Sequence, residues 1–379
     1  MTRVPGMVLS RVTRRGSLAQ IRYVAAIPPG HAPDPVTAVY AQVERDFGML
    51  APPVVLHAPA PDLLAACWSM LRETLLATGA ADRAVKESIA ATVSVGNSCP
   101  YCAEVHTAVL HGLLRTQDAV AIGGGRITAI EDPGVRQTAA WARASGTRAE
   151  AAGAERPFPT SQLPELVGVA VTFQYLNRMV NIFLAESVIP SGVPAAVRGV
   201  LPSVIGRIMR PAARRFCEPG ASLSLLPSAA LPADLAWASG NPAVAGAFAR
   251  AAAATDAAAE RTVPEGVSRL LLSELAGWDG QPPGPSRAWT RDALSGLPQA
   301  QRSAGQLALL TALASYQVDR GVIEDFRADH PGDQALIELT SWASLAAARR
   351  VGSWMGGRPV PADGPGREAG DQPRTTSRT

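Results

Sequence analysis

The chain has 379 residues, nearly half of them hydrophobic, with interspersed charges and a net charge of only +3. This composition excludes a disordered or fibrous protein, and no basic stripe with interleaved aromatic residues points to nucleic acid, so no such partner is expected. No apolar run is long enough to cross a membrane, and the first residues lack the apolar stretch of a signal peptide, so we expect a cytoplasmic protein without a membrane partner.

Alanine, the best helix former, dominates the composition and aromatic residues are scarce, which favours an all-α fold. Residues 1–35 are basic and then rich in proline, and we interpret them as an N-terminal arm. From Val36 to about Leu114, apolar residues recur at the three-to-four spacing of helices. Within that stretch, Pro61 is placed to begin a helix and Gly79 to end it.

Helical and loop-like stretches alternate further along the chain. Residues 116–162 contain loop sequences around a helical piece near 135–144, and residues 163–187 predict an amphipathic helix. Helical patterns return over 235–355. The last stretch, 356–379, has no apolar face and is predicted to be a disordered tail.

Residues 191–234, rich in proline and glycine, are predicted to connect two halves of the chain and to hold a basic helix at 197–216. One interpretation of this helix is a membrane-surface segment. Because Pro202 and Pro211 interrupt it and its apolar face is short, we favour a helix packed on its own protein with its arginines facing water.

A pair of cysteines three residues apart, Cys99 and Cys102, gives the clearest chemical signal. They follow a predicted helix over 84–95. Ser98 and Pro100 are typical of a helix start, so both thiols are expected in the first turn of a new helix. The helix dipole and free N–H groups there predict lowered thiol pKa values. The spacing also puts both thiols on one face, where first-turn geometry can close a disulfide.

His106 and Glu87 are placed to exchange protons with these thiols. His106 follows Cys102 by four residues, on the same helix face, within reach as a base or proton relay. Glu87 lies on the preceding helix and can reach the start of the second helix if the two pack as a hairpin. The group therefore favours thiol redox chemistry.

Two other interpretations of the cysteine motif remain open. Together with His106 and His111 the cysteines would supply four zinc ligands, although His111 points away from the others at about 100° per residue, so we expect no metal. The pair could also be an inert structural CxxC. Cys67 and Cys217 have no partner nearby in sequence and are expected to be buried small side chains.

These residues resemble the superfamily of alkyl hydroperoxidase D and carboxymuconolactone decarboxylase, in its peroxidase-related branch. The motif that carries the resemblance consists of Glu87, Asn97, Cys99, Tyr101, Cys102 and His106. The similarity extends over about residues 36–190 and includes the later segment FQYLNRMV. It departs at Tyr101, where the best-known hydroperoxidases have a histidine, so one proton carrier is missing.

The resemblance implies an all-α alkyl hydroperoxidase D-like domain over 36–190, with Cys102 as the peroxide-attacking thiolate and Cys99 as the resolving thiol. It implies a proton relay through Glu87 and His106, supported by Tyr101 and Asn97, in a thiol-dependent peroxidase. Its partners would be a hydroperoxide and an external dithiol or thiol-protein electron donor, without a bound cofactor, and homo-oligomers are known among such relatives. Alternatives are a general disulfide oxidoreductase or redox sensor and, less favoured, a zinc-binding protein or a decarboxylase, whose members generally lack the cysteine pair.

Residues 235–355 resemble a degenerate second copy of the first unit. In the alignment, Gln306 falls on Glu87, and Val318, Gly321 and Asp325 fall on Cys99, Cys102 and His106. A later segment aligns Arg349 with Arg178. We therefore predict a tandem duplication whose second unit has lost its chemistry and is retained to cover the apolar face of the first.

Overall fold

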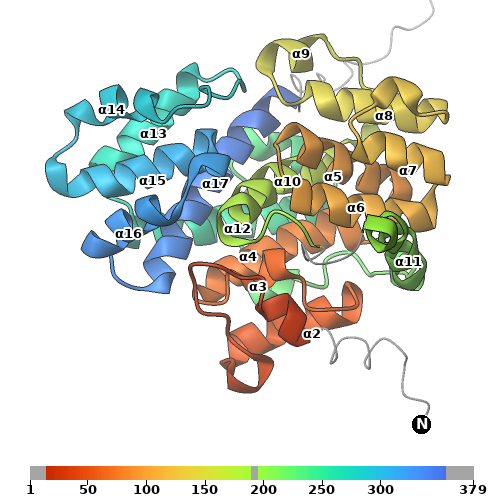
Figure 1. The fold of residues 1–379 in the computed structure, drawn as a ribbon, viewed down its shortest axis with the longest axis horizontal. Coiled ribbons are helices and arrows are strands. Elements are labelled where there is room, and N and C mark those ends of the chain that lie inside the picture. The colour runs from red at the N-terminus through yellow and green to blue at the C-terminus, as the bar shows by residue number, and fades with distance from the viewer. Residues whose placement is uncertain (1–13, 189–194, 356–379) are drawn as a thin grey trace, which may run out of the picture.

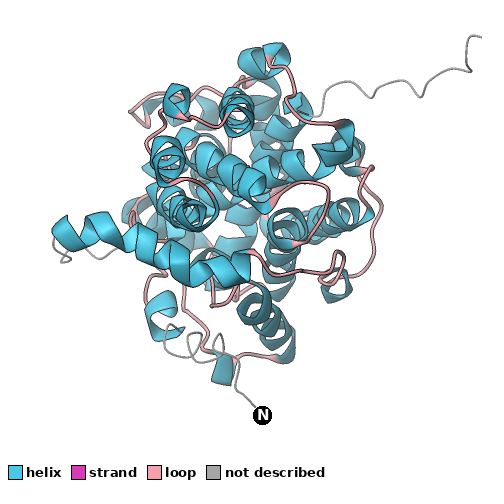
Figure 2. Cartoon of the chain, turned by 90° about the vertical axis from the view of Figure 1, so that its right-hand side faces the viewer, coloured by secondary structure: helices cyan, strands magenta, loops and turns pink. Residues whose placement is uncertain are grey.

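A computed structural model of the chain describes residues 14–188 and 195–355. Within these ranges every regular element is a helix and no strand occurs, which confirms the predicted all-α fold (Figure 2). None of the described helices is long and apolar enough to span a membrane. The predicted tail at 356–379 lies outside the described residues.

The first half contains the α-helices α2 to α10, and two of them carry the cysteine motif. Their bounds are α2 (Asp34–Asp46), α3 (Pro52–Val55), α4 (Pro61–Leu71, continued by a π-helical turn over Arg72–Leu76), α5 (Arg83–Gly96), α6 (Pro100–Leu113), α7 (Thr116–Gly123), α8 (Pro133–Ala144), α9 (Arg148–Gly153) and α10 (Leu163–Phe183). Several begin with proline in the first turn, where the missing N–H removes no helical hydrogen bond.

The second half begins with the helix of the predicted connection. Its described helices are α11 (Ala195–Ala213), α12 (Pro242–Thr262), α13 (Glu265–Gly277), α14 (Ala288–Ala293), α15 (Arg302–Leu313), α16 (Arg320–Asp329) and α17 (Asp333–Met355). Caps mark their starts: the Asn241 side chain accepts from the N–H groups of Ala243 and Val244, and the Asp319 side chain accepts from Val322 N–H.

Two long helices, α10 and α17, form the centre of the molecule (Figure 1). Every residue of α10 except Asn181 is buried, so the helix is surrounded by protein on all sides. At its contact with α17 the Ser344 hydroxyl donates to the Tyr175 carbonyl at 2.8 Å. One hydrophobic core runs through both halves of the chain.

The order of helices around the site in the first half returns in the second. The pair α5 and α6 followed by α10 corresponds to α15 and α16 followed by α17. In the predicted alignment Arg83 pairs with Arg302, and these residues begin α5 and α15. The helices α7 to α9 intervene only in the first copy. The unit boundaries at 36–190 and 235–355 remain predictions.

The predicted basic helix is present as α11, and it packs against α6 with Arg207 and Arg210 exposed. The expectation that prolines interrupt it was wrong: the helix is continuous through Pro202 and Pro211. Each proline removes a backbone hydrogen bond, but the helix also packs along α6 and continues past both positions. Figure 2 shows this helix lying across the face of the molecule.

The described part of the N-terminal arm is folded onto the protein. Arg14 forms an ion pair with Glu44 at 2.6 Å, and Ala25 N–H donates to Asp333 at 2.6 Å. The arm therefore contacts the start of α17 as well as α2.

Candidate active site

The cysteine motif lies at the tight turn between α5 and α6. Ser98 adopts a left-handed conformation with φ of 50°, and Cys99 N–H donates to the Ser94 carbonyl at 2.9 Å. Cys99 is the N-cap residue and Pro100 the first helical residue, so the expectation that Ser98 caps the helix was wrong. The left-handed turn moves Ser98 out of the capping position and places both thiols at the helix start, as predicted.

Both thiols are free in this structure and almost completely buried, with Cys99 1% and Cys102 3% exposed. Burial, together with the hydrogen bond and negative potential of Cys99, raises the pKa of Cys102 well above its ordinary value. The expectation of a lowered pKa was therefore wrong for Cys102. Desolvation disfavours the thiolate more strongly than the helix start favours it.

Glu87 and His106 meet next to the thiols, as the sequence pattern predicted. His106 Nδ1 lies 2.6 Å from Glu87 Oε2, and the other carboxylate oxygen of Glu87 accepts from Arg83 at 2.8 Å. Burial opposes ionisation of Glu87, which has no exposed surface, but the charges of Arg83 and His106 outweigh it and lower its pKa. An ionised Glu87 accepts a hydrogen bond from the Nδ1–H group, which leaves Nε2 of His106 as a proton acceptor.

The two supporting residues also lie at this turn. The Tyr101 hydroxyl donates to the Gln20 side chain at 2.7 Å, so the N-terminal arm reaches the motif. Asn97 ends α5, and its carbonyl accepts from the Asn181 side chain at 3.4 Å. Tyr101 and Asn97 thus hold the turn in place against two distant segments of the chain.

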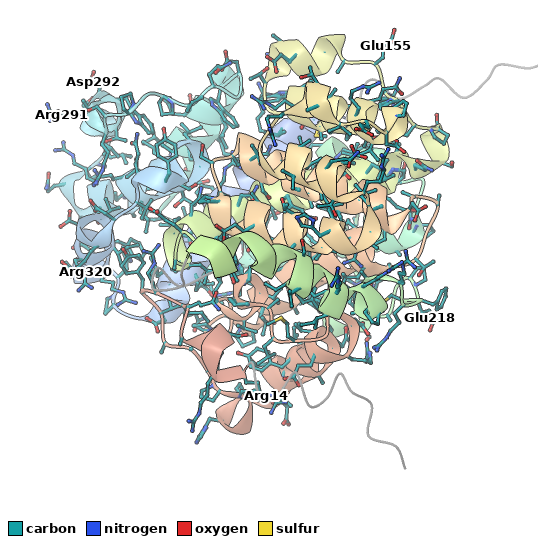
Figure 3. All side chains as sticks on the ribbon, turned by 45° about the vertical axis from the view of Figure 1, so that its right-hand side comes forward. Arg14, Glu155, Glu218, Arg291, Asp292 and Arg320 are labelled. Atoms are coloured by element: carbon teal, nitrogen blue, oxygen red, sulfur yellow. The ribbon has the colours of Figure 1, made fainter. Side chains whose placement is uncertain are left out.

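A cavity of about 1180 Å³ leads to the thiols. Cys99, Cys102 and His106 line it together with α11 and the segment around Pro52. Most of its lining is apolar. The Phe173 ring of α10 meets the His106 ring edge-on, with centroids 4.5 Å apart. Figure 3 shows α11, in green, lying across the front of α6.

The sequence analysis did not identify several residues of this site. Arg83 was detectable, because it lies four residues before Glu87 on the same helix face. Gln20 and Phe173 come from segments far away in the chain. His111, set aside because it points away from the cysteines, nevertheless lines the same cavity, which curves around α6.

The remaining cysteines take no part in this arrangement. Cys67 and Cys217 are both buried, as predicted, and burial raises the pKa of each thiol. Across residues 14–188 and 195–355, no group of three or more His, Cys, Asp or Glu side chains is arranged to hold a metal ion. At the aligned positions of the second copy, Gln306 and Asp325 line a separate cavity of about 730 Å³.

An all-helical fold with a CxxC pair at a helix start, next to a Glu–His pair, defines the class of protein. The chain belongs to the carboxymuconolactone decarboxylase family, whose pattern it matches over residues 61–144. It is 34% identical over 336 residues, which cover 89% of this chain and 95% of the relative, to a Mycobacterium tuberculosis protein named alkyl hydroperoxide reductase Rv2159c.

Proposed function

We propose that the protein is a thiol-dependent peroxidase in which Cys102 attacks the hydroperoxide and Cys99 resolves the product. The observation that carries this proposal is that a buried dithiol and His106 line one cavity, with Glu87 bonded to His106 behind its wall. The name of the mycobacterial relative supports the same class of enzyme, an oxidoreductase acting on peroxide.

In the first step His106 Nε2 takes the proton of the Cys102 thiol, because the pKa of this thiol is too high for it to ionise unaided. The thiolate sulfur attacks the terminal peroxide oxygen, so an S–O bond forms and the O–O bond breaks. The leaving alkoxide takes the proton back from His106 and departs as an alcohol. Cys102 is thereby oxidised to a sulfenic acid and the peroxide is reduced.

In the second step the Cys99 thiol attacks the Cys102 sulfur, which forms the disulfide and releases the hydroxyl group as water. An external dithiol or a thiol-protein donor then reduces the disulfide by exchange and is itself oxidised. Glu87 keeps its negative charge throughout and stabilises His106 when the ring is protonated.

The two cysteine roles are tested by separate serine variants. Cys102→Ser is expected to abolish peroxide consumption, since the attacking sulfur is lost. Cys99→Ser is expected to consume one equivalent of peroxide and to stop at a sulfenic acid on Cys102, without turnover. Dimedone labelling with mass spectrometry and a peroxide titration without added thiol measure the Cys99→Ser outcome, because a free dithiol would itself reduce the sulfenic acid. A peroxide assay with dithiothreitol measures the loss of turnover in Cys102→Ser.

Cys217→Ser is the matched control, because Cys217 is a buried thiol outside the cavity and should keep full turnover. A sulfenic acid on Cys99 in the Cys102→Ser protein would show that the two roles are reversed. Wild-type protein that reduces disulfides but leaves hydroperoxides unchanged would instead establish a general disulfide oxidoreductase.

A further inference from the structure

The outer wall of the cavity comes from a segment that contributes nothing to the cysteine motif. Ile205, Ile208 and Met209 of α11 line the cavity, although this helix belongs to the connection between the halves. It lies outside residues 61–144, which match the family pattern. This part of the cavity lining is therefore formed by residues that do not belong to the catalytic motif.

Helix α11 is held at a fixed position by close backbone contact with α6. A Cβ atom built on Gly206 would lie 2.3 Å from the Ala108 carbonyl oxygen and 3.0 Å from the Gly112 nitrogen. Only glycine permits this approach, so the two backbones touch where the helices cross. Ile205 and Met209 flank Gly206 and, four residues apart, lie on one helix face.

The size and the chemistry of the cavity fit a large apolar molecule. Its volume of about 1180 Å³ exceeds by far what hydrogen peroxide occupies. Phe47, Met49 and Leu71 continue the apolar lining on other elements, whereas polar groups that can act on a peroxide gather at Cys99, Cys102 and His106. Ile208, which is 52% exposed, lies where the lining meets solvent.

We propose that α11 is the specificity-determining wall of this site, and that it selects organic hydroperoxides with a bulky apolar group over hydrogen peroxide. Ile205 and Met209 contact the apolar group while the peroxide end reaches Cys102. The inference rests on the proposed peroxidase function and adds the residues that choose the substrate.

The test compares kcat/KM for cumene hydroperoxide and for hydrogen peroxide, with the full-length protein and dithiothreitol as donor. Met209→Trp and Ile205→Trp fill the cavity from the wall. A substrate that misfits an apolar pocket by about one group loses about 10-fold to 200-fold in kcat/KM relative to one that fits. The kcat/KM of each variant for cumene hydroperoxide should therefore fall by at least about 10-fold. Turnover of hydrogen peroxide should stay within about 2-fold of wild type, because the small substrate does not use the wall.

Val204→Trp is the matched control, since Val204 lies on the same helix but is 41% exposed and does not line the cavity. It should leave both activities at the wild-type level. A binding readout accompanies the kinetics: cumyl alcohol, the unreactive product, should slow alkylation of Cys102 by iodoacetamide in wild type but not in Met209→Trp. Circular dichroism verifies that each variant is folded.

The role of α11 would be overturned if the folded tryptophan variants lost kcat/KM equally for both peroxides. It would also be overturned if cumyl alcohol protected Cys102 equally in wild type and in Met209→Trp. Wild-type protein that turns over both peroxides with the same kcat/KM would also overturn it. Absence of turnover with either peroxide in wild type would instead refute the proposed function, so the two failures are distinguishable.

Discussion

At the scale of single residues, burial and neighbouring charges together shift the pKa values of Glu87 and Cys102 in opposite directions. Glu87 has no exposed surface, yet its pKa is lowered because Arg83 and His106 each contact one of its oxygens. For Cys102, burial and the neighbouring Cys99 both disfavour the thiolate, and its pKa is raised. These shifts favour the charged form of the carboxylate and the protonated form of the thiol, and in the proposed mechanism the thiol therefore passes its proton to His106 before attack.

Glu87→Gln and His106→Ala are each expected to slow peroxide turnover by about 10²-fold to 10⁴-fold, the usual contribution of general acid–base catalysis. Circular dichroism should show wild-type helical content in both. Glu150→Gln, which removes an exposed carboxylate on α9, is the control and should retain full activity. Full activity of His106→Ala would rule out the proton relay.

At the scale of elements, the contact between α6 and α11 depends on the absence of two side chains. A Cβ on Gly112 would lie 2.5 Å from the Gly206 carbonyl oxygen, and a Cβ on Gly206 would lie 2.3 Å from the Ala108 carbonyl oxygen. These separations are far below van der Waals distance, so any larger residue must move one helix away from the other. Since α11 forms a wall of the cavity, its position and the shape of the cavity are linked.

Gly206→Val is therefore expected to detach α11 from α6. Amide hydrogen exchange within α11 should accelerate by at least about 10-fold, since local opening of a loosened helix requires less free energy. Gly277→Val is the control, because a Cβ there meets nothing within 4 Å. Unchanged exchange in α11 of the Gly206→Val protein would show that the close approach does not hold the helix.

At the scale of the whole molecule, the second half covers the apolar helix α10 of the first. His57, Tyr175 and Ser341 link the halves within the core. The Tyr175 hydroxyl lies 2.7 Å from His57 Nε2 and 3.1 Å from Ser341 Oγ, while His57 Nδ1 donates to the Val54 carbonyl. The second half thus buries α10, and its retention for this purpose after a duplication stays a prediction.

This link makes stability depend on pH. Burial lowers the pKa of His57 from 6.5 to about 4. Between these values the unfolded chain binds a proton that the folded protein excludes, so the stabilisation present above pH 6.5 is lost as the pH falls toward 4. The shift corresponds to about 3 kcal/mol in the free energy of unfolding.

Urea denaturation of wild type and His57→Asn at pH 7 and pH 4.5 measures this contribution. Wild type should lose about 2–3 kcal/mol more than the variant over this range, because only wild type has the excluded imidazole. His31→Asn, at an exposed histidine, is the control and should follow wild type. Equal losses in wild type and His57→Asn would show that His57 is protonated without penalty in the folded state.

The sequence alone was sufficient for the local features of this protein. Helical periodicity, prolines in first turns and the spacing of Glu87, Cys99, Cys102 and His106 depend on neighbours within one or two helical turns or on one helical hairpin. The structure confirms the helices and brings Glu87 to His106. The aligned helix starts at Arg83 and Arg302 also agree with the predicted repeat.

Only the tertiary structure determined the properties that depend on which distant residues surround a side chain. The helix start by itself predicts a lowered pKa for Cys102, but the cover supplied by distant segments removes water and raises it. Gln20, Phe173 and the wall residues of α11 join the site from far along the chain, and no local pattern encodes such contacts. Burial is a property of the packed molecule, and therefore both the acidity of the thiol and the shape of its cavity follow only from the complete fold.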